Sequence, residues 1–160
     1  MRIAWTTDIA ISGLTPSAAL AGNYGGGFQF ARLRGEEGNP IIIVSADPRR
    51  PAVFGNAKTG LHLSNPAFVE LQDLEFARLG TNGLNIDDGG DRDGAGAHNV
   101  VLRGLRVRDV GSGGNQDGIK LSGLADFRVE AYTIERWGGG GSGIDMVGCH
   151  RGATATGSVR

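Results

Sequence analysis

Short segments in which apolar and polar residues alternate recur along the chain, each opened by a glycine. They start at Gly60, Gly83, Gly118 and Gly143 and read GLHLS, GLNID, GIKLS and GIDMV. This period of two predicts strands with one face in a core and one in solvent. An α-helix is not expected, because apolar residues recur at i and i+2 and glycine is frequent.

A second apolar frame follows each of the first three glycines, and the three copies align without a gap. They are Val69-x-Leu71-x-x-Leu74-x-Phe76, Val100-x-Leu102-x-x-Leu105-x-Val107 and Phe127-x-Val129-x-x-Tyr132-x-Ile134. The glycine starts lie 23, 35 and 25 residues apart, and the excess over 23 falls at two turns. Such insertions are tolerated by a stack of coils. We therefore predict an all-β, single-stranded parallel β-helix of about 4–5 coils, each of about 23 residues.

The domain boundaries follow from where the repeat begins and fades. A fainter coil is expected to start at Gly27 and continue through residues 41–44. Residues 1–26, with a short helix at residues 16–20, are expected to form a lead-in that caps the N-terminal end of the stack. Residues 27–160 are the repeats, and they stop part-way through a coil without a polar cap, so we expect a truncated C-terminal end.

Composition narrows the range of partners. The chain has 160 residues and a formal charge of −1, which provides no basic field for nucleic acid. No apolar run approaches the roughly 18 residues that membrane insertion needs, and the N-terminus lacks the apolar core of a secretory signal. Cys149 is the one cysteine, so no disulfide forms within the chain. We expect a monomer.

Stacking would turn aligned positions into columns, because neighbouring coils pair about 4.8 Å apart. The residues after each glycine face inward, and the next residues face outward as a polar strip. The strip consists of Gln29, His62, Asn85, Lys120 and Asp145. Both enlarged turns, residues 87–94 and 113–117, flank this strip, so we predict a groove there.

Carboxylates gather in the first enlarged turn at Asp87, Asp88, Asp91 and Asp93. Oxygen ligands in a flexible, glycine-rich segment suit Ca²⁺, although the spacing is not that of an EF-hand, and an ordinary solvated acidic turn is the alternative.

Two further residues are candidates for acid–base chemistry. Lys120 could act as a base if a bound cation helped it to lose its proton, or it could simply keep the groove soluble. His150 could act as acid or base near neutral pH, or be an exposed turn residue.

The segments GLNIDDGG, HNVVLRGLRVRDVG, NQDGIKLSG and GSGIDMVGCHRG resemble the bacterial right-handed parallel β-helix repeat proteins of the pectate-lyase-like superfamily. The resemblance covers roughly residues 24–157. It implies a right-handed helix and an extracellular or periplasmic protein, often carbohydrate-active. The superfamily includes lyases, hydrolases, esterases and non-catalytic surface proteins, so the resemblance does not choose the chemistry.

Within it, the leading interpretation is a polysaccharide lyase-like enzyme that cleaves acidic, uronate-containing polysaccharide by Ca²⁺-assisted β-elimination. The expected catalytic residues are Lys120, as the base, with Asp145 and His150. The expected substrate-binding residues are His62, Asn85, Asp117 and Arg151, and the acidic turn is expected to bind the metal.

Two alternatives remain open. Asn115-Gln116-Asp117 resembles one segment of the inverting glycoside hydrolases of the polygalacturonase type, but their Asp pair and Gly-His-Gly segment are missing. The predicted Cα separation of Asp117 and Asp145, roughly 11 Å, also weakens a hydrolase. The other alternative is a non-catalytic, cell-surface or glycan-binding β-helix.

Overall fold

The computed structural model describes residues 3–4, 10–11, 17–91, 96–111 and 113–160. These residues form strands and turns without an α-helix. None of them belongs to an apolar helix of the length that a bilayer crossing requires. One short antiparallel pair, β1 (Ile3–Ala4) with β2 (Ala10–Ile11), precedes the three larger sheets.

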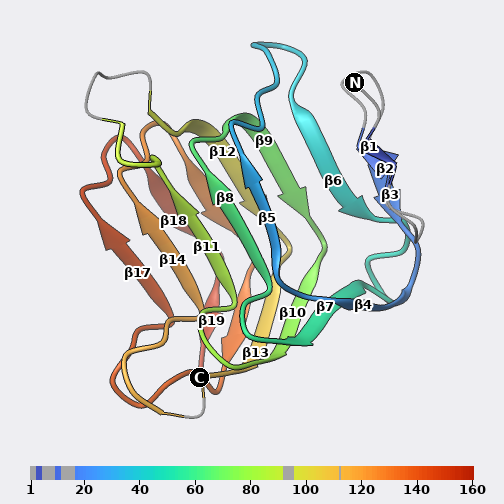
Figure 1. Ribbon diagram of the computed structural model, residues 1–160, viewed down its shortest axis with the longest axis vertical. Helices are drawn as coiled ribbons and strands as arrows, with labels where there is room; N and C mark the ends of the chain where they lie inside the picture. Colours follow the sequence, from blue (N-terminus) through green and yellow to red (C-terminus); the bar gives the residue numbers. More distant parts are fainter. Residues whose placement is uncertain (1–2, 5–9, 12–16, 92–95, 112) are drawn as a thin grey trace.

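Three sheets of parallel strands make up the body of the molecule, as Figure 1 shows. The first sheet contains β5 (Phe28–Ala31), β8 (Leu61–Ser64), β11 (Leu84–Asp87), β14 (Ile119–Ser122) and β17 (Ile144–Val147). The second contains β3 (Ser17–Ala19), β6 (Ile41–Ser45), β9 (Ala67–Gln72), β12 (His98–Arg103), β15 (Arg128–Glu130) and β18 (Ala153–Ala155). The third contains β4 (Gly22–Gly25), β7 (Ala52–Ala57), β10 (Glu75–Leu79), β13 (Arg106–Val110), β16 (Thr133–Glu135) and β19 (Ser158–Val159).

From β5 onward the chain passes through the first, second and third sheets in the same order in each coil. This arrangement is consistent with the predicted parallel β-helix. The fainter coil expected from Gly27 is present as β5 and β6, which confirms that part of the repeat assignment.

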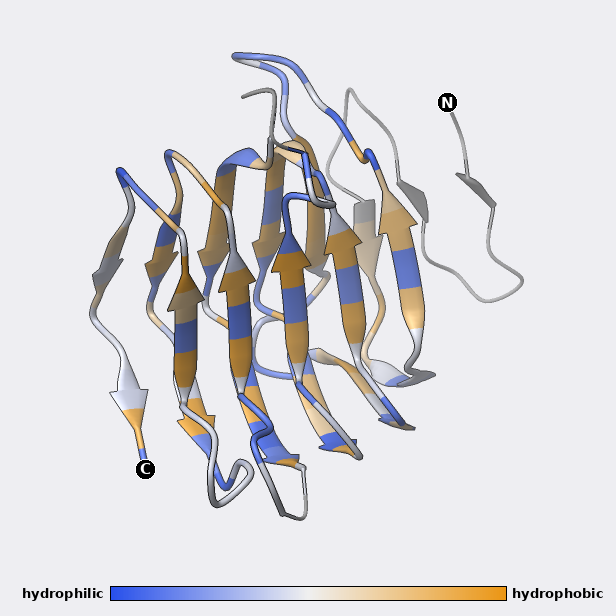
Figure 2. Cartoon of the chain, turned by 60° about the vertical axis from the view of Figure 1, so that its left-hand side comes forward, coloured by the Kyte–Doolittle hydropathy of each residue, from blue (hydrophilic) through white to orange (hydrophobic). Residues whose placement is uncertain are grey.

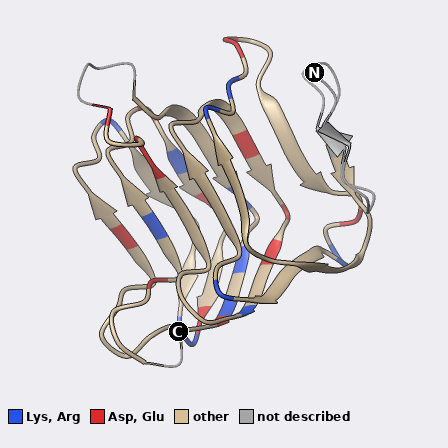
Figure 3. Ribbon diagram, viewed as in Figure 1, with Lys and Arg blue, Asp and Glu red and all other residues tan. Residues whose placement is uncertain are grey.

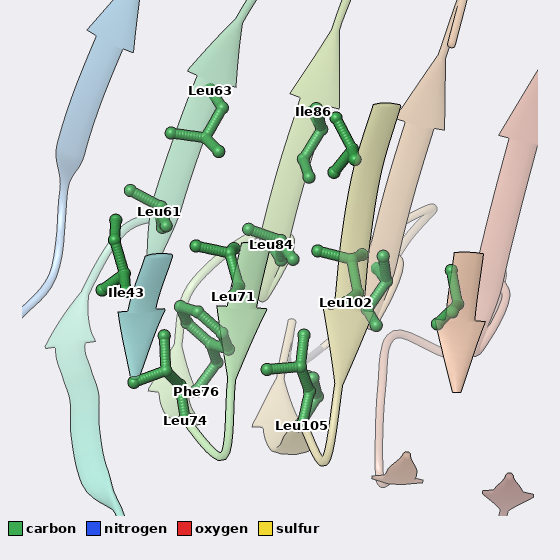
Figure 4. Close-up of a cluster of buried hydrophobic side chains, with 14 of the residues drawn as sticks. Ile43, Leu61, Leu63, Leu71, Leu74, Phe76, Leu84, Ile86, Leu102 and Leu105 are labelled. Carbon is green, nitrogen blue, oxygen red and sulfur yellow. The ribbon is translucent and has the colours of Figure 1, made fainter. Parts of the chain in front are cut away.

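The interior is filled by columns of apolar side chains from successive coils (Figure 4). Leu61, Leu84 and Ile119 pair in register in the first sheet, as the glycine frame predicts. All three are buried. The neighbouring inward column of Leu63, Ile86 and Leu121 is more open at its last member: in β17, at the edge of the sheet, Met146 is 45% exposed.

Close packing between coils explains the glycine that opens each frame. A Cβ atom on Gly83 would lie 2.6 Å from the carbonyl oxygen of Gly118 in the next coil and 2.6 Å from the Val107 side chain. No larger residue fits without moving the backbone. The glycine spacing therefore records a steric requirement of the stack.

One N-terminal prediction is wrong. Residues 17–19 of the expected helix form β3, which pairs with β6 through Ser17↔Ile43 and Ala19↔Ser45. Pro16 lies outside the described residues. A helix of five residues is too short to be stable alone, whereas pairing with an existing strand satisfies the backbone at once. Since β4 likewise pairs with β7, two sheets begin before Gly27.

We expect Leu71→Ala to lower the free energy of unfolding by about 2–5 kcal/mol, because it leaves a cavity in a fully buried position. Leu20, 58% exposed between β3 and β4, provides the matched control, and Leu20→Ala should change stability little. Urea unfolding monitored by circular dichroism measures both. Equal losses for the two variants would contradict the assigned core.

Candidate functional site

The predicted polar strip is present on the outer face of the first sheet. Its residues pair in register from coil to coil: Gln29 with His62, His62 with Asn85, Asn85 with Lys120 and Lys120 with Asp145. In Figure 2 the strip follows the hydrophilic bands that lie between hydrophobic positions on these strands. Parallel pairing thus brings residues 23 to 35 positions apart in sequence side by side.

Lys120 is held between two carboxylates. Its Nζ lies 2.7 Å from Oδ2 of Asp145 and 3.4 Å from Oδ2 of Asp117. The opposite charges of β14 and β17 lie on neighbouring strands in Figure 3. The hydrogen bond to Asp145 is the main cause that raises the pKa of Lys120 above its usual value. The side chain therefore carries a positive charge at neutral pH.

Asp117 lies beneath Lys120 and not on the surface, since it is only 2% exposed. Its Oδ1 accepts the backbone N–H of Ser142 at 2.8 Å, and its own N–H donates to Oδ1 of Asn82 at 2.8 Å. Asn82, Asp117 and Ser142 each precede the glycine of their coil. Because Asp117 is buried, this geometry does not support its predicted contact with substrate. Its hydrogen bonds instead link three successive coils, and its Oδ2 contacts Lys120 from the buried side.

A second cluster surrounds Asp87 at the end of β11. Its Oδ2 lies 2.5 Å from Nε2 of His62, and its Oδ1 accepts the hydroxyl of Ser64 at 2.9 Å. The amide of Asn85 donates to the same Oδ2 at 3.4 Å, and the Gly89 N–H donates to Oδ1 at 2.9 Å. Asp87 therefore orients the imidazole of His62 on the strip.

Burial alone would raise the pKa of Asp87. Hydrogen bonds from His62, Ser64 and the Gly89 N–H outweigh burial and bring the pKa below its usual value. The carboxylate is thus ionised at neutral pH, which is the state that accepts a hydrogen bond from the histidine ring.

The remaining carboxylates of the acidic turn point to different places. The side chain of Asp88 turns toward Gly123, and its Oδ2 lies where a side chain on Gly123 would clash with it. Oδ2 of Asp91 accepts a hydrogen bond from the Asn65 amide at 3.3 Å. Asp93 lies outside the described residues. Within the described residues, no three His, Cys, Asp or Glu side chains gather as a metal site would require. The Ca²⁺ site stays a prediction.

His150 and Arg151 lie beyond the strip, in the turn from β17 toward β18. His150 is exposed and bridges to Ala125 in the adjacent coil. The guanidinium of Arg151 binds Asp126 through two hydrogen bonds, of 2.7 and 2.8 Å. The structure therefore brings together His62, Asn85, Lys120, Asp145, Asp87 and the underlying Asp117, but it does not add His150 and Arg151 to them.

Two features of the site escape the sequence interpretation. Asn82 was not singled out, although polar residues precede the glycine in successive coils and that pattern could have identified it. The pairing of His62 with Asp87 was also missed. In register the two residues are diagonal neighbours, two positions along and one coil across, within reach of a histidine ring.

A crystal structure of alginate lyase from Paenibacillus sp. str. FPU-7 is similar to this chain, with a TM-score of 0.64 over 89% of the chain. The two sequences are 15% identical, so the likeness concerns the fold alone. The match spans 58% of the alginate lyase chain, so this chain corresponds to a little more than half of that protein. No protein-family model and no curated protein matches the sequence.

We expect Asp117→Asn to destabilise the protein by about 1–3 kcal/mol, because an amide can keep the bond from Ser142 only by turning its NH₂ group toward Lys120. Asp145→Asn is the control: this carboxylate also binds Lys120 but is partly exposed, and its loss should cost less than about 1 kcal/mol. Denaturant unfolding compares the two. A larger cost at Asp145 would contradict the role of Asp117 as a buried brace.

Acid titration should reveal the Asp87 cluster. Because the folded-state pKa of Asp87 is lowered, its ionised form contributes stability above the unfolded value of 3.8, and this stability is lost as the pH falls toward the folded value. The difference in stability between wild type and Asp87→Asn should therefore shrink from about pH 5 to about pH 3. Thermal unfolding across this range measures it, and a difference independent of pH would argue against the cluster.

Proposed function

We propose that the polar strip binds acidic polysaccharide and cleaves it by β-elimination, in the manner of a polysaccharide lyase. The observation that carries the proposal is the coil-to-coil register that places His62, Asn85 and Lys120 next to one another on one outer face. The likeness in fold to a protein whose name states that it cleaves alginate supports the same substrate class.

The reaction requires charge compensation at the sugar carboxylate. Loss of the C5 proton of a uronate becomes easier when the adjacent carboxylate is neutralised, because negative charge then develops beside a positive group. The ammonium of Lys120 supplies that charge, and the amide of Asn85 in the adjacent coil supplies a neutral donor.

The base is assigned to His62. Asp87 fixes Nε2, so the neutral ring carries its proton there and leaves Nδ1 as the acceptor. In the reaction Nδ1 takes the C5 proton, the electron pair forms the C4–C5 double bond, the bond from C4 to the glycosidic oxygen breaks, and solvent protonates that oxygen. Lys120 as the base, the sequence-based expectation, would first have to lose a proton that Asp145 and Asp117 stabilise.

Calcium belongs to the proposal as an aid to binding. The strip and the layer beneath it contain more acidic than basic side chains: Asp87, Asp117 and Asp145 against Lys120. This excess of negative charge disfavours the binding of a polyanionic polysaccharide. A divalent cation would relieve the repulsion. Because the described carboxylates do not converge on one point, no chemical step is assigned to the metal.

An inverting hydrolase fits the geometry less well. It would need both Asp117 and Asp145 to reach the substrate or a water molecule on opposite sides of the sugar. Asp117 is buried, and its two carboxylate oxygens are occupied by Ser142 and Lys120. The arrangement leaves Asp145 as the only accessible carboxylate of that pair.

We expect the protein to produce unsaturated oligosaccharides, detected by their ultraviolet absorbance, from at least one polymer in a panel of alginates and polygalacturonates. His62→Gln should reduce the rate by about a hundredfold or more, because the base is lost. Lys120→Ala should reduce kcat/KM by about ten- to a hundredfold, because the uronate carboxylate loses its ion pair with the ammonium group. Chelation should raise KM more than it lowers kcat.

Lys58→Ala is the matched control, since this exposed lysine lies in the turn between β7 and β8 and is not part of the strip. It should leave the rate unchanged. Polymer binding without any absorbance change would favour the non-catalytic glycan-binding alternative. Full activity in both His62→Gln and Lys120→Ala would show that the elimination occurs at another site.

A further inference from the structure

A groove lies on the outer face of the second sheet, separate from the polar strip. Its volume of about 610 Å³ is in the range of pockets that hold small ligands. It crosses β9, β12, β15 and the start of β18, and so runs along the stack. One end is bounded by the hairpin at residues 36–39, which rises between β5 and β6.

The floor of the groove is apolar. Phe68 and Val101 project outward from β9 and β12, and the nearly buried ring of Phe127 lies at the turn before β15. Phe68 has a φ of 51°, a left-handed conformation that is unfavourable for a bulky side chain. The residues at the equivalent position in the next two coils are Asn99 and Asp126, types that adopt this conformation more readily. An aromatic ring that is kept partly exposed in an unfavourable backbone conformation is a candidate for contact with a ligand.

Charge is segregated along the groove. Arg128 follows Val101 in the same outward column and makes no ion pair with any described residue. The carboxylates of Glu36, Glu37 and Glu70 lie toward the hairpin end. Asp126 is already compensated by Arg151. A ligand that fills the groove therefore meets a guanidinium at one end and hydrogen-bond acceptors at the other.

The geometry points to a second carbohydrate site in this groove, which takes a short uronate-bearing oligosaccharide. A guanidinium matches a carboxylate in two parallel hydrogen bonds, Phe68 and Val101 offer a surface for the apolar face of a sugar ring, and the glutamates accept bonds from hydroxyl groups. Phe68 and Arg128 are two coils apart and offset by two residues along the strand, so their Cα atoms lie roughly 12 Å apart, a distance that a short oligosaccharide spans. The inference rests on the substrate class of the proposed function but not on its catalytic residues.

The test uses uronate di- to tetrasaccharides prepared from alginate and polygalacturonate, together with their carboxyl-reduced counterparts. Binding is measured by isothermal titration calorimetry, and its position by amide chemical shifts around Val101 and Arg128. All measurements use Lys120→Ala as background so that the strip is weakened. We expect the uronates to bind about tenfold more tightly than the reduced sugars.

Two variants and one control isolate the site. Arg128→Ala should remove the tenfold preference. Phe68→Asn should weaken the binding of uronates and reduced sugars alike by about tenfold, and asparagine suits the left-handed backbone conformation at this position. Arg103→Ala is the control: Arg103 is on the same outer face of β12, outside the groove, and is paired with Glu130. It should leave binding unchanged.

The outcomes separate this inference from the proposed function. The second site would be overturned if Arg128→Ala left the affinity and the amide chemical-shift changes unaltered, or if Arg103→Ala changed them equally. This holds even if elimination on the strip is found. Binding that depends on Arg128 in a protein without elimination activity would uphold the second site while the proposed reaction fails.

Discussion

The parallel register between coils is the constraint on which the rest of the structure depends. Leu61, Leu84 and Ile119 fall in one buried column because the strands pair without a shift, and His62, Asn85 and Lys120 fall in one outward-facing, partly exposed row for the same reason. A slip of one residue in any strand would exchange the core side of that strand with its surface side. The core and the candidate site are thus set by the same backbone hydrogen bonds.

The fold was accessible from the sequence because each coil repeats the same local requirements. A glycine where a Cβ atom would strike the next coil, followed by alternating apolar residues, is visible without coordinates. The segment at residues 17–19 was misjudged for the opposite reason. It carries too few apolar positions to reveal a period, and its strand conformation depends on pairing with β6, a contact distant in sequence.

The site was only partly accessible. Alternation predicted which residues face outward, but not that Asp117, just ahead of a strand, turns inward beneath its neighbour. Nor could spacing reveal that Asp87 contacts His62 while Asp88, the next residue, turns toward Gly123. Both depend on side-chain directions at turns, where the period of two ends. The pKa values of Lys120 and Asp87 follow from these contacts and were equally hidden.

The side chains of Asn82 and Asp117 each accept the N–H of the corresponding residue in the following coil, so these bonds have a direction along the stack. A change in the chemistry of one such residue alters the support of the coil that follows it and leaves the preceding one with its partner intact. The effect of such a change on stability is therefore transmitted toward the C-terminal side of the altered position.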